Sequence, residues 1–523
     1  MPVIEREIKF RLPEGLDPAR VREAVEAAGF RLERQSSVLH EDRYLDTDDW
    51  ALYRAGLALR LRGDGQRLRL EAKTMRSTSK KALERTEWVQ DAPMIEPPWT
   101  EIEPGPVAGL LHPLAGLRVL ERLRVSARLE NRREFFRWLR GEEAVGTLTV
   151  DRVSAFDGPE TPPTLFDEVE IEEAHPNGTN GTHALSRAAE ALDDVRRAVE
   201  ERLGLEANVA SKLATALAAA GERAPVCEER TFIAHPADRL VDVAHKTFAR
   251  HFGRMLWNEP GARLGVDPGF VHDMRVAIRR LRTAIEVLTD AYAPDPFEDF
   301  ASDLRWTARA LGRVRDLDVA LERVQAMAAE APSIERPALT IFAQSLLLDR
   351  AHARLRLIER LDSERFASFV AAAKAWVALG APPASSTPTG GAPAYTAGPR
   401  IVARWARGMD EAYEVADREA GAKDLHALRI AAKKARYAIE YFGDLEGQES
   451  LRRAKRIAGL QDFLGEHQDA VMLLGRMRKY AKTVPRRDTE LAMSAGSVLG
   501  HLERATRVRR SELRRAWDRV TEP

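Results

Sequence analysis

The sequence has almost no cysteine and no long apolar run. Cys227 is the only cysteine among 523 residues, so an intramolecular disulfide is impossible, which fits a reducing cytoplasm. No stretch of about 18 apolar residues occurs, which predicts a chain that does not span a membrane. The amino terminus enters a strand pattern directly, without the apolar segment of a signal peptide. We therefore expect a cytoplasmic protein, with at least two domains because of its length.

Net charge is also absent, but the charges are unevenly distributed. Residues 1–220 hold 32 Lys and Arg and 39 Asp and Glu, a net charge of −7. The remainder holds 81 − 32 = 49 basic and 81 − 39 = 42 acidic residues, a net charge of +7. This asymmetry indicates a metal-using front part and an anion-binding back part, although chance drift over two ordinary surfaces would give the same counts.

A short segment near the amino terminus, 5–10, carries the first candidate site. Alternate side chains of a strand share a face, so Glu5, Glu7 and Lys9 lie on one face. Arg6, Ile8 and Phe10 lie on the other. Two carboxylates and an ammonium are costly to bury without partners. They suit a site that binds hard cations and phosphate oxygens together.

Charged and apolar residues alternate in further segments of the front part. A half-exposed antiparallel sheet would give the same alternation with its charges in water. Here, however, each strand carries mainly one kind of charge, and the acidic strands lie near the two ends of the domain. We therefore predict a closed antiparallel β-barrel with a polar lumen and flanking helices at 183–203 and 206–220. The further expected strands are 38–47, 57–62, 67–74, 85–89, 125–138, 148–153 and 166–172.

The ordered set of motifs resembles the CYTH superfamily, the triphosphate tunnel metalloenzymes. The resemblance covers 1–215 and implies a tunnel barrel that hydrolyses inorganic triphosphate, or a related triphosphate, with Mg²⁺ or Mn²⁺. Nucleotide cyclisation, known elsewhere in the superfamily, is a further possibility. The matching residues are Glu5-x-Glu7-x-Lys9, Tyr44-Leu45-Asp46-Thr47, Arg60-x-Arg62, Lys73, Arg85-x-Glu87, Arg133 and Glu168-x-Glu170-x-Glu172.

The resemblance and the chemistry of phosphoryl transfer, which depends on charge neutralisation and positioning, imply individual roles. Asp151 is either a metal ligand or a turn residue at a strand end, and Lys212 either a phosphate ligand or an exposed helix lysine. The expected catalytic residues are Glu5, Glu7, Lys9 and Lys73. The expected metal ligands are Glu5, Glu7, Asp151, Glu168, Glu170 and Glu172. The expected phosphate ligands are Lys9, Arg60, Arg62, Lys73, Arg85, Arg133 and Lys212.

Five residues depart from the family pattern. Val89 stands where a further acid is usual, and Thr147 and Thr149 stand where a carboxylate is expected. Thr215-Ala216 replaces an Arg-Gly pair. These departures leave the rate and the substrate open.

The back part contains an internal repeat and reads as helical nearly throughout. We place a linker at 216–230 and the helical domain at 231–515. Residues 272–286 match 426–440, and each copy is followed by a second matched segment. Residues 381–400, rich in Pro, Gly, Ser and Thr, are expected to form a flexible loop between the two halves. The predicted fold is therefore α+β and multidomain, a barrel followed by an all-α bundle.

Each copy of the repeat places basic residues on one helix face, because positions i, i+3, i+7 and i+10 share a face. A solvated face with intrahelical salt bridges is the ordinary explanation, but few acids stand at the matching spacings. Unpaired basic stripes on two facing helices would repel unless an anion lay between them. The stripes are His272, Arg275, Arg279 and Arg282, and His426, Arg429, Lys433 and Arg436.

The doubled His-x-x-Arg-x-x-x-basic-basic-x-Arg motif resembles the CHAD domain, a helical bundle that often follows CYTH domains and binds inorganic polyphosphate. The two histidines are as easily structural as phosphate ligands. Arg313, Arg315, Lys455 and Arg456 are further candidates. The implied polyphosphate ligands are His272, Arg275, Arg279, Arg280, Arg282, His426, Arg429, Lys433, Lys434 and Arg436.

Two functions follow from this reading. One is a metal-dependent triphosphatase whose basic bundle binds polyphosphate. The alternative is a non-catalytic polyphosphate-binding or targeting protein with an inactive barrel. Nucleic-acid binding is the weakest possibility, because the sequence lacks interleaved aromatic and basic residues suited to base stacking. The sequence does not indicate an oligomeric state.

Overall fold

The chain divides into two compact units, Met1–Val226 and Cys227–Pro523. The predicted linker lies partly outside the described residues, because 220–224 and 228–230 are not among them. No helix in the described part of the chain is long and apolar enough to cross a membrane. The computed structural model describes residues 3–75, 83–92, 96–156, 162–173, 181–207, 211–219, 225–227, 234–292, 294–383, 387, 389–419, 421–485, 487–506 and 510–521.

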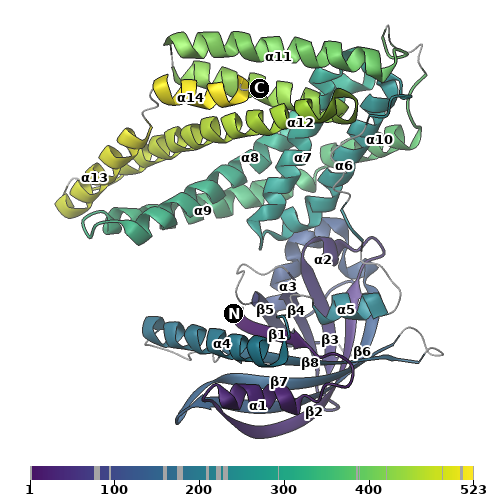
Figure 1. Cartoon of the computed structure of the whole chain (residues 1–523), viewed down its shortest axis with the longest axis vertical. Coiled ribbons are helices and arrows are strands. Elements are labelled where there is room, and N and C mark those ends of the chain that lie inside the picture. Colours follow the sequence, from purple (N-terminus) through teal and green to yellow (C-terminus); the bar gives the residue numbers. More distant parts are fainter. Residues whose placement is uncertain are drawn as a thin grey trace. The chain divides into compact units, whose positions relative to one another are not determined.

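The first unit is a closed antiparallel barrel, which confirms the predicted fold (Figure 1). Around the barrel, the described strands follow the order β1-β5-β4-β3-β2-β6-β7-β8. They are β1 Val3–Arg11, β2 Arg31–Asp46, β3 Leu57–Gly63, β4 Leu68–Thr74, β5 Leu83–Asp91, β6 Arg124–Arg140, β7 Glu143–Phe156 and β8 Thr164–Glu173.

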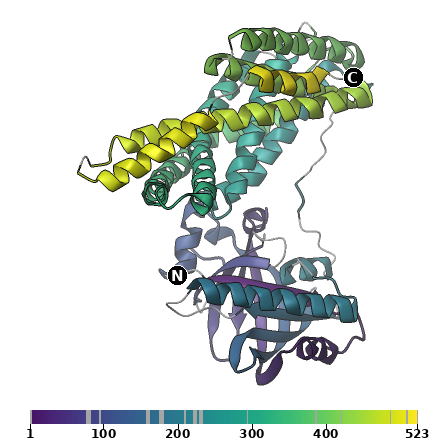
Figure 2. The same cartoon turned by 60° about the vertical axis from the view of Figure 1, so that its left-hand side comes forward.

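Strand β1 closes the barrel by pairing with two strands at once. Its first half pairs with β5, and its second half, from Glu7 to Arg11, pairs with β8. The outward side chains Ile8 and Phe10 are buried in an apolar cluster with α1 (Ala19–Ala27) and α4 (Gly181–Leu203). Figure 2 shows α4 running along the outside of the barrel. The two-faced character predicted for this strand is therefore confirmed.

A second group of short helices caps the barrel. Helix α5 (Lys212–Ala219) packs Leu213 and Leu217 against Tyr44 and Phe166 of the barrel wall. The predicted helix over 206–220 is too long, since Ala207 forms an isolated β-bridge with Phe10 instead. Residues 208–210 lie outside the described residues. The other short elements are α2 Ala51–Arg54, α3 Pro106–Leu111, η1 His112–Leu117 and η2 Leu120–Arg122.

The second unit is mostly helical, as predicted, and its described residues contain no strand, only one isolated β-bridge between Arg239 and Pro393. Its core contains an aromatic cluster in which Phe248 packs against Phe252, Phe297, Phe300 and Trp376. The helices are α6 Leu240–Leu264, α7 Pro268–Val287, η3 Thr289–Ala291, α8 Pro294–Glu330, α9 Arg336–Leu361, α10 Glu364–Ala378, α11 Ala394–Glu419, α12 Ala422–Ala481, α13 Thr489–Ala505 and α14 Arg510–Thr521.

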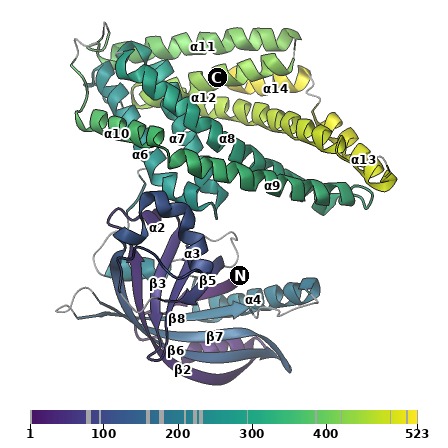
Figure 3. The same ribbon diagram turned by 180° about the vertical axis from the view of Figure 1, so that it is seen from behind.

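The internal repeat maps onto these helices. The first copy lies on α7 and its matched segment on α8. The second copy and its matched segment both lie on α12, which is interrupted at Gly447 (φ 81°, ψ 176°), a conformation that L side chains rarely adopt. In the second unit α8 and α9 run side by side as a long antiparallel pair (Figure 3). Two halves of similar construction therefore form the bundle.

The connecting segment between the halves is shorter than expected. Helix α11 begins at Ala394, so the last residues of the predicted loop at 381–400 are helical. Of that loop, 384–386 and 388 lie outside the described residues.

Candidate functional site

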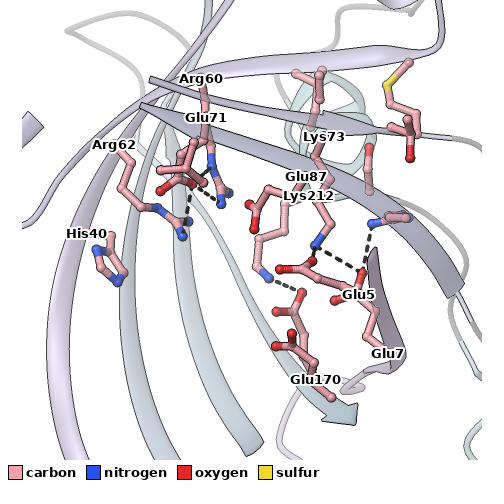
Figure 4. A pocket seen from close by; sticks show the side chains of 18 of the residues that line it. Glu5, Glu7, His40, Arg60, Arg62, Glu71, Lys73, Glu87, Glu170 and Lys212 are labelled. Atoms are coloured by element: carbon pink, nitrogen blue, oxygen red, sulfur yellow. Dashed lines mark hydrogen bonds and ion pairs between the residues drawn. The ribbon is translucent and has the colours of Figure 1, made fainter. Parts of the chain in front are cut away.

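The barrel holds a cavity of about 310 Å³ whose lining is mostly charged (Figure 4). The figure shows Arg60, Arg62 and Glu71 on one side and Glu5 and Glu7 on the other. The charged and histidine side chains that line it are Glu5, Glu7, Lys9, His40, Arg60, Arg62, Arg69, Glu71, Lys73, Arg85, Glu87, Arg133, Glu170, Glu172 and Lys212.

Carboxylates crowd together on the acidic side of the cavity. Glu7 of β1 stands directly opposite Glu172 of β8 in the strand register, and like charges so placed repel. Burial and the nearby Glu5 raise the pKa of Glu172 to about 7. Burial and a hydrogen bond to Glu5 raise the pKa of Glu87 to about 8. These raised pKa values mean that both carboxyls hold protons to a large extent at neutral pH, because burial and neighbouring carboxylates disfavour their charged forms.

Two lysines partly compensate these carboxylates. The Lys73 ammonium contacts Glu5 and lies 3.6 Å from Glu7. Burial alone would raise the pKa of Glu5, but Lys73 outweighs it and lowers that pKa to about 2. Lys9 Nζ lies 2.5 Å from Glu170 and 3.5 Å from Glu7. The two ammonium groups thus lie between carboxylates, the position that a cation would take.

Buried acids fix the arginines of the opposite side. Arg62 donates to both oxygens of Asp42 at 2.7 Å each. Arg60 donates twice to Glu71 at 2.9 and 2.7 Å. Such paired hydrogen bonds hold each guanidinium in one orientation. The third nitrogen of Arg60, Nη1, donates to Asp42 and Tyr44 at 3.5 Å each. Beside Arg62, His40 lines the same cavity, and burial followed by the Arg62 charge lowers its pKa to about 4, so it is neutral.

Asp151 corrects one expectation from the sequence. It lies inside β7 and not at a strand end, is fully buried, and does not line the cavity. It accepts two hydrogen bonds from Arg133 at 2.6 Å each, and Lys212 Nζ lies 2.9 Å away. Asp151 therefore positions two basic side chains, those of Arg133 and Lys212, in this structure. Glu168 is likewise fully buried away from the cavity, 3.4 Å from Arg11.

Lys212 is not an exposed helix lysine. It begins α5, is 5% exposed, and reaches into the cavity, where its Nζ lies 2.5 Å from Glu170. The structure thus excludes one of the two alternatives that the sequence left open, and the role of Lys212 as a phosphate ligand stays a prediction.

Sequence reasoning gave no role in the site to several residues of the basic side, although Tyr44 belongs to a matched motif. His40, Asp42 and Tyr44 alternate along β2 and so share one face, the same period-two signal that identified β1. Glu71 alternates with Lys73 along β4, but its pairing with Arg60 depends on the register between β3 and β4. The alternation could have found all four residues, whereas the ion pairs could not be read from one strand at a time.

In the bundle, the basic stripes of α7 and α12 face each other closely enough to interact. Burial and the charges of Arg279 and Arg282 lower the pKa of Lys433 to about 8, against the opposing effect of Glu286. Burial and Arg279 likewise lower the pKa of Arg429. Within the described residues, Arg275, Arg279, Arg282, Arg429 and Lys433 have no carboxylate within 4.0 Å.

The two arginines that lead the stripes have matching surroundings. Arg275 lies over Gly312 of α8, where an added Cβ would come within 3.7 Å of its Nε. Arg429 lies in the same way over Gly465 of α12, at 3.7 Å from Nη2. The repeat therefore reproduces this contact. His272 and His426, each three residues before one of these arginines, are exposed.

The other predicted polyphosphate ligands are engaged by acids. Arg280 and Arg436 both contact Glu440, and Lys434 contacts Glu286. Of the further candidates, Arg456 lies 2.8 Å from Glu449.

Comparison with known families decides the assignment of both units. A CYTH domain model matches residues 3–201, and a CHAD domain model matches 246–478. This chain contains a CYTH domain followed by a CHAD domain. A search of curated proteins found no match.

Solved structures of both kinds resemble parts of the chain. The CHAD domain from the plant Ricinus communis is 24% identical and covers 56% of this chain and 96% of its own, with a TM-score of 0.46. PptA from Streptomyces chartreusis is 17% identical and covers 54% and 100%, with a TM-score of 0.44. HpAC1 from Hippeastrum, described as an adenylyl cyclase candidate with a dominant triphosphatase activity, is 19% identical and covers 42% and 98%, with a TM-score of 0.25.

The carboxylates of the CYTH cavity fit a hard divalent cation. They are oxygen donors, the ligand type that hard divalent cations prefer, and several of them line one cavity. In the described part of the chain, no three His, Cys, Asp or Glu side chains form a preformed metal cluster. Lys73 lies between Glu5 and Glu7 instead, so metal binding requires this ammonium to move.

Three of the departures from the family pattern lie in the CYTH cavity or next to strands that line it. Val89 lines it and is 40% exposed. Thr149 lies opposite Glu170 in the register, and its buried Oγ1 has no hydrogen-bond partner among the described residues. Thr147 lies opposite Glu172. Two carboxylates of β8 thus have threonines as their β7 neighbours.

Proposed function

We propose that the CYTH domain is a divalent-metal-dependent triphosphatase and that the CHAD domain binds inorganic polyphosphate. One observation carries the first part: the carboxylates of Glu5 and Glu7 lie across a single cavity from fixed arginines. A metal–triphosphate complex needs oxygen ligands for the cation and guanidinium or ammonium donors for the phosphates. The barrel offers both within one lumen.

The residues divide the work as follows. Glu5, Glu7, Glu170 and Glu172 would hold the cation, which when bound neutralises phosphate oxygens and makes a coordinated water more acidic. Arg60 and Arg62, oriented by Glu71 and Asp42, bind oxygens of the phosphate chain. Arg133 and Lys212, oriented by Asp151, bind it from the other wall.

Lys9 and Lys73 lie at the boundary between acidic and basic groups. Each ammonium can leave its carboxylate for a phosphate oxygen as the cation takes over the carboxylates. Phosphoryl transfer gains most from such preorganised charge, and this barrel needs no covalent intermediate.

The lining favours inorganic triphosphate over a nucleotide. Among the described residues, Tyr44 and Phe135 are the aromatic lining side chains apart from His40, and the rest are mostly charged. A nucleobase needs an apolar or stacking surface that this lining provides poorly.

Phosphate release tests the enzyme. The purified chain is incubated with tripolyphosphate, ATP, thiamine triphosphate and long-chain polyphosphate, with Mg²⁺, with Mn²⁺, or with EDTA. We expect release from tripolyphosphate with either metal and none in EDTA. No release from any substrate would contradict the enzyme proposal and favour the non-catalytic alternative.

A matched pair of variants locates the activity. E5Q/E7Q removes two charges from the inner face of β1 and should abolish turnover while leaving polyphosphate binding intact. R6Q removes a charge from the outer face of the same strand, where Arg6 contacts Glu84 at 3.7 Å, and should leave turnover unchanged. Equal activity of E5Q/E7Q and R6Q would show that the cavity is not the active site.

The observation that supports polyphosphate binding is the pair of facing basic stripes, in which five cations have no carboxylate within 4.0 Å among the described residues. They are Arg275, Arg279, Arg282, Arg429 and Lys433. R279Q/K433Q removes one cation from each stripe and should weaken polyphosphate binding strongly without changing phosphate release from tripolyphosphate. R504Q/R519Q, on exposed positions of α13 and α14, is the matched control. Equal binding by both double variants would contradict this part of the proposal.

The alternative, a CYTH barrel that binds phosphate without turnover, also has an observation in its favour. Val89, Thr147 and Thr149 stand where the family resemblance implies acids, and the described residues hold no preformed metal cluster. Retained tripolyphosphate binding without release in any metal would establish it.

A further inference from the structure

A separate pocket lies on the CHAD domain between α8 and α9. Its volume is about 240 Å³, and its lining contains four arginines, one tryptophan and two alanines. Arg309 and Arg313 are one turn apart on α8, and Arg356 and Arg360 are one turn apart on α9. The four guanidinium groups thus come from two adjacent helices.

These arginines have no acidic partners. None of the four has a carboxylate within 4.0 Å among the described residues, and the lining contains no Asp or Glu. Arg360 donates to the backbone oxygen of Trp306 at 2.5 Å. Four like charges around one pocket repel one another, so an anion bound among them would be stabilised.

The single aromatic residue of the pocket is already covered. Trp306 has the Arg360 guanidinium 4.3 Å and the Arg365 guanidinium 4.8 Å from its ring centroid. Arg365 is itself held by Asp303 at 2.7 Å. A base that stacked on Trp306 would have to displace one of them. The pocket therefore suits a phosphate chain without bases better than a nucleic acid.

The pocket is electrostatically continuous with the basic stripes. Burial and the charges of Arg279 and Arg282 on α7 lower the pKa of Lys433 on α12. Burial and the charges of Arg305 and Arg309 on α8 lower the pKa of Arg282. Burial and the charges of Arg309 and Arg313 lower the pKa of Arg360 on α9. A row of mutually interacting cations therefore crosses four helices, from α12 to α9.

We propose that the α8/α9 arginine pocket is a second anion site, which binds further phosphates of the same inorganic chain that occupies the stripes. The inference rests on the proposed polyphosphate binding and extends it to chain length. A long chain that binds both the stripes and the pocket gains affinity, because once one part is bound the other is held at a high effective concentration. A chain of three phosphates binds at only one of the two sites. The CHAD domain then selects long polyphosphate over short.

The test compares R313Q/R356Q with wild type in the full chain, in EDTA so that no hydrolysis occurs. Arg313 and Arg356 are exposed and make no ion pair among the described residues, so the fold should not depend on them. We expect affinity for long-chain polyphosphate to fall about tenfold, with the salt dependence of log K reduced by about two. Affinity for tripolyphosphate should stay within about twofold of wild type.

Three results would overturn the inference. In the first, R313Q/R356Q binds long chains as wild type does while R279Q/K433Q does not; the proposed function would then stand without the pocket. In the second, the control R504Q/R519Q loses as much affinity as R313Q/R356Q. In the third, R313Q/R356Q loses binding to single-stranded oligonucleotide but not to polyphosphate. If R279Q/K433Q also binds long chains normally, the proposed polyphosphate function itself fails.

Discussion

Arg280 of α7 donates to Glu440 of α12 at 2.5 Å, and the repeat-related pair, Lys434 of α12 and Glu286 of α7, lies at 2.9 Å. The two halves of the CHAD bundle are thus joined by two ion pairs that use equivalent positions of the repeat. Arg280 also lies over the Tyr437 ring at 4.5 Å. These two cations join the halves, although the motif predicted them as polyphosphate ligands.

The two pairs should differ in their effect on stability. The Glu440 side chain is 14% exposed and contacts both Arg280 and Arg436, whereas the Glu286 side chain is 46% exposed. We expect E440Q to lower the free energy of unfolding by about 1–2 kcal/mol, and E286Q by no more than about 0.5 kcal/mol. Thermal unfolding followed by the helical circular dichroism signal measures both. Equal destabilisation by the two variants would contradict this account.

E172Q should separate stability from activity in the barrel. It removes the like charge opposite Glu7, so the metal-free protein should become more stable by up to about 1 kcal/mol. Loss of one metal ligand should lower kcat/KM for tripolyphosphate about 100-fold. The control is D167N. Asp167 lies on the outer face of β8, opposite Arg152 of β7, and its substitution should change neither quantity. A fully active E172Q would remove Glu172 from the proposed ligands.

D151N tests whether Asp151 is a metal ligand or a positioning residue. Because Asp151 orients Arg133 and Lys212, its loss should raise KM for tripolyphosphate about tenfold. The Mg²⁺ concentration that gives half-maximal activity should stay unchanged. A shift of that concentration as large as the one caused by E5Q would instead support the role that the sequence suggested.

Polyphosphate binding should depend on pH through Lys433. Its pKa in the free protein is lowered to about 8, and a bound polyanion raises it, so binding takes up a proton above pH 8. Affinity should therefore be constant below about pH 7 and fall as the pH rises through 8 and beyond. Glu286, Arg279, Arg282 and Lys434 face the same ammonium and set this value.

K433R is the control for that pH dependence. Arginine keeps its charge throughout this range, so the variant should bind polyphosphate with no decline between pH 7 and 9. Titrations by isothermal calorimetry at several pH values give the comparison. An identical decline in wild type and K433R would assign the effect to another group.

Strand alternation was enough to predict the barrel, because the period of two separates faces whatever the partner strand is. It failed where the period breaks. The start of β2 at Arg31 was missed by seven residues, since 31–37 contains a single apolar residue, Leu32, and a register shift lies between Arg34 and Ser36. A bulge moves side chains to the other face, which a strict alternation cannot follow.

The site was predictable in kind but not in its pairings. The alternation along each strand was enough to predict that Glu5, Arg60 and Lys73 face one lumen. They could not show that Arg133 is held by Asp151, because that pairing depends on the register between β6 and β7. In the bundle, the motif predicted the cations, but only the packing of α7 on α12 separates those that join the halves from those left without carboxylate partners.

The double pairing of β1 has a consequence for how the barrel folds. Residues 3–11 are synthesised before their partners in β5 and β8, and the contact between Arg11 and Glu168 spans 157 positions. Pairings so distant in sequence form slowly, because the loop entropy is lost before the contacts compensate it. Strand β1 can therefore complete its pairing only after β8, the last strand of the barrel in sequence, has been synthesised. A barrel that has failed to close also lacks the juxtaposed Glu7 and Glu172, so an incompletely folded chain has no complete acidic side.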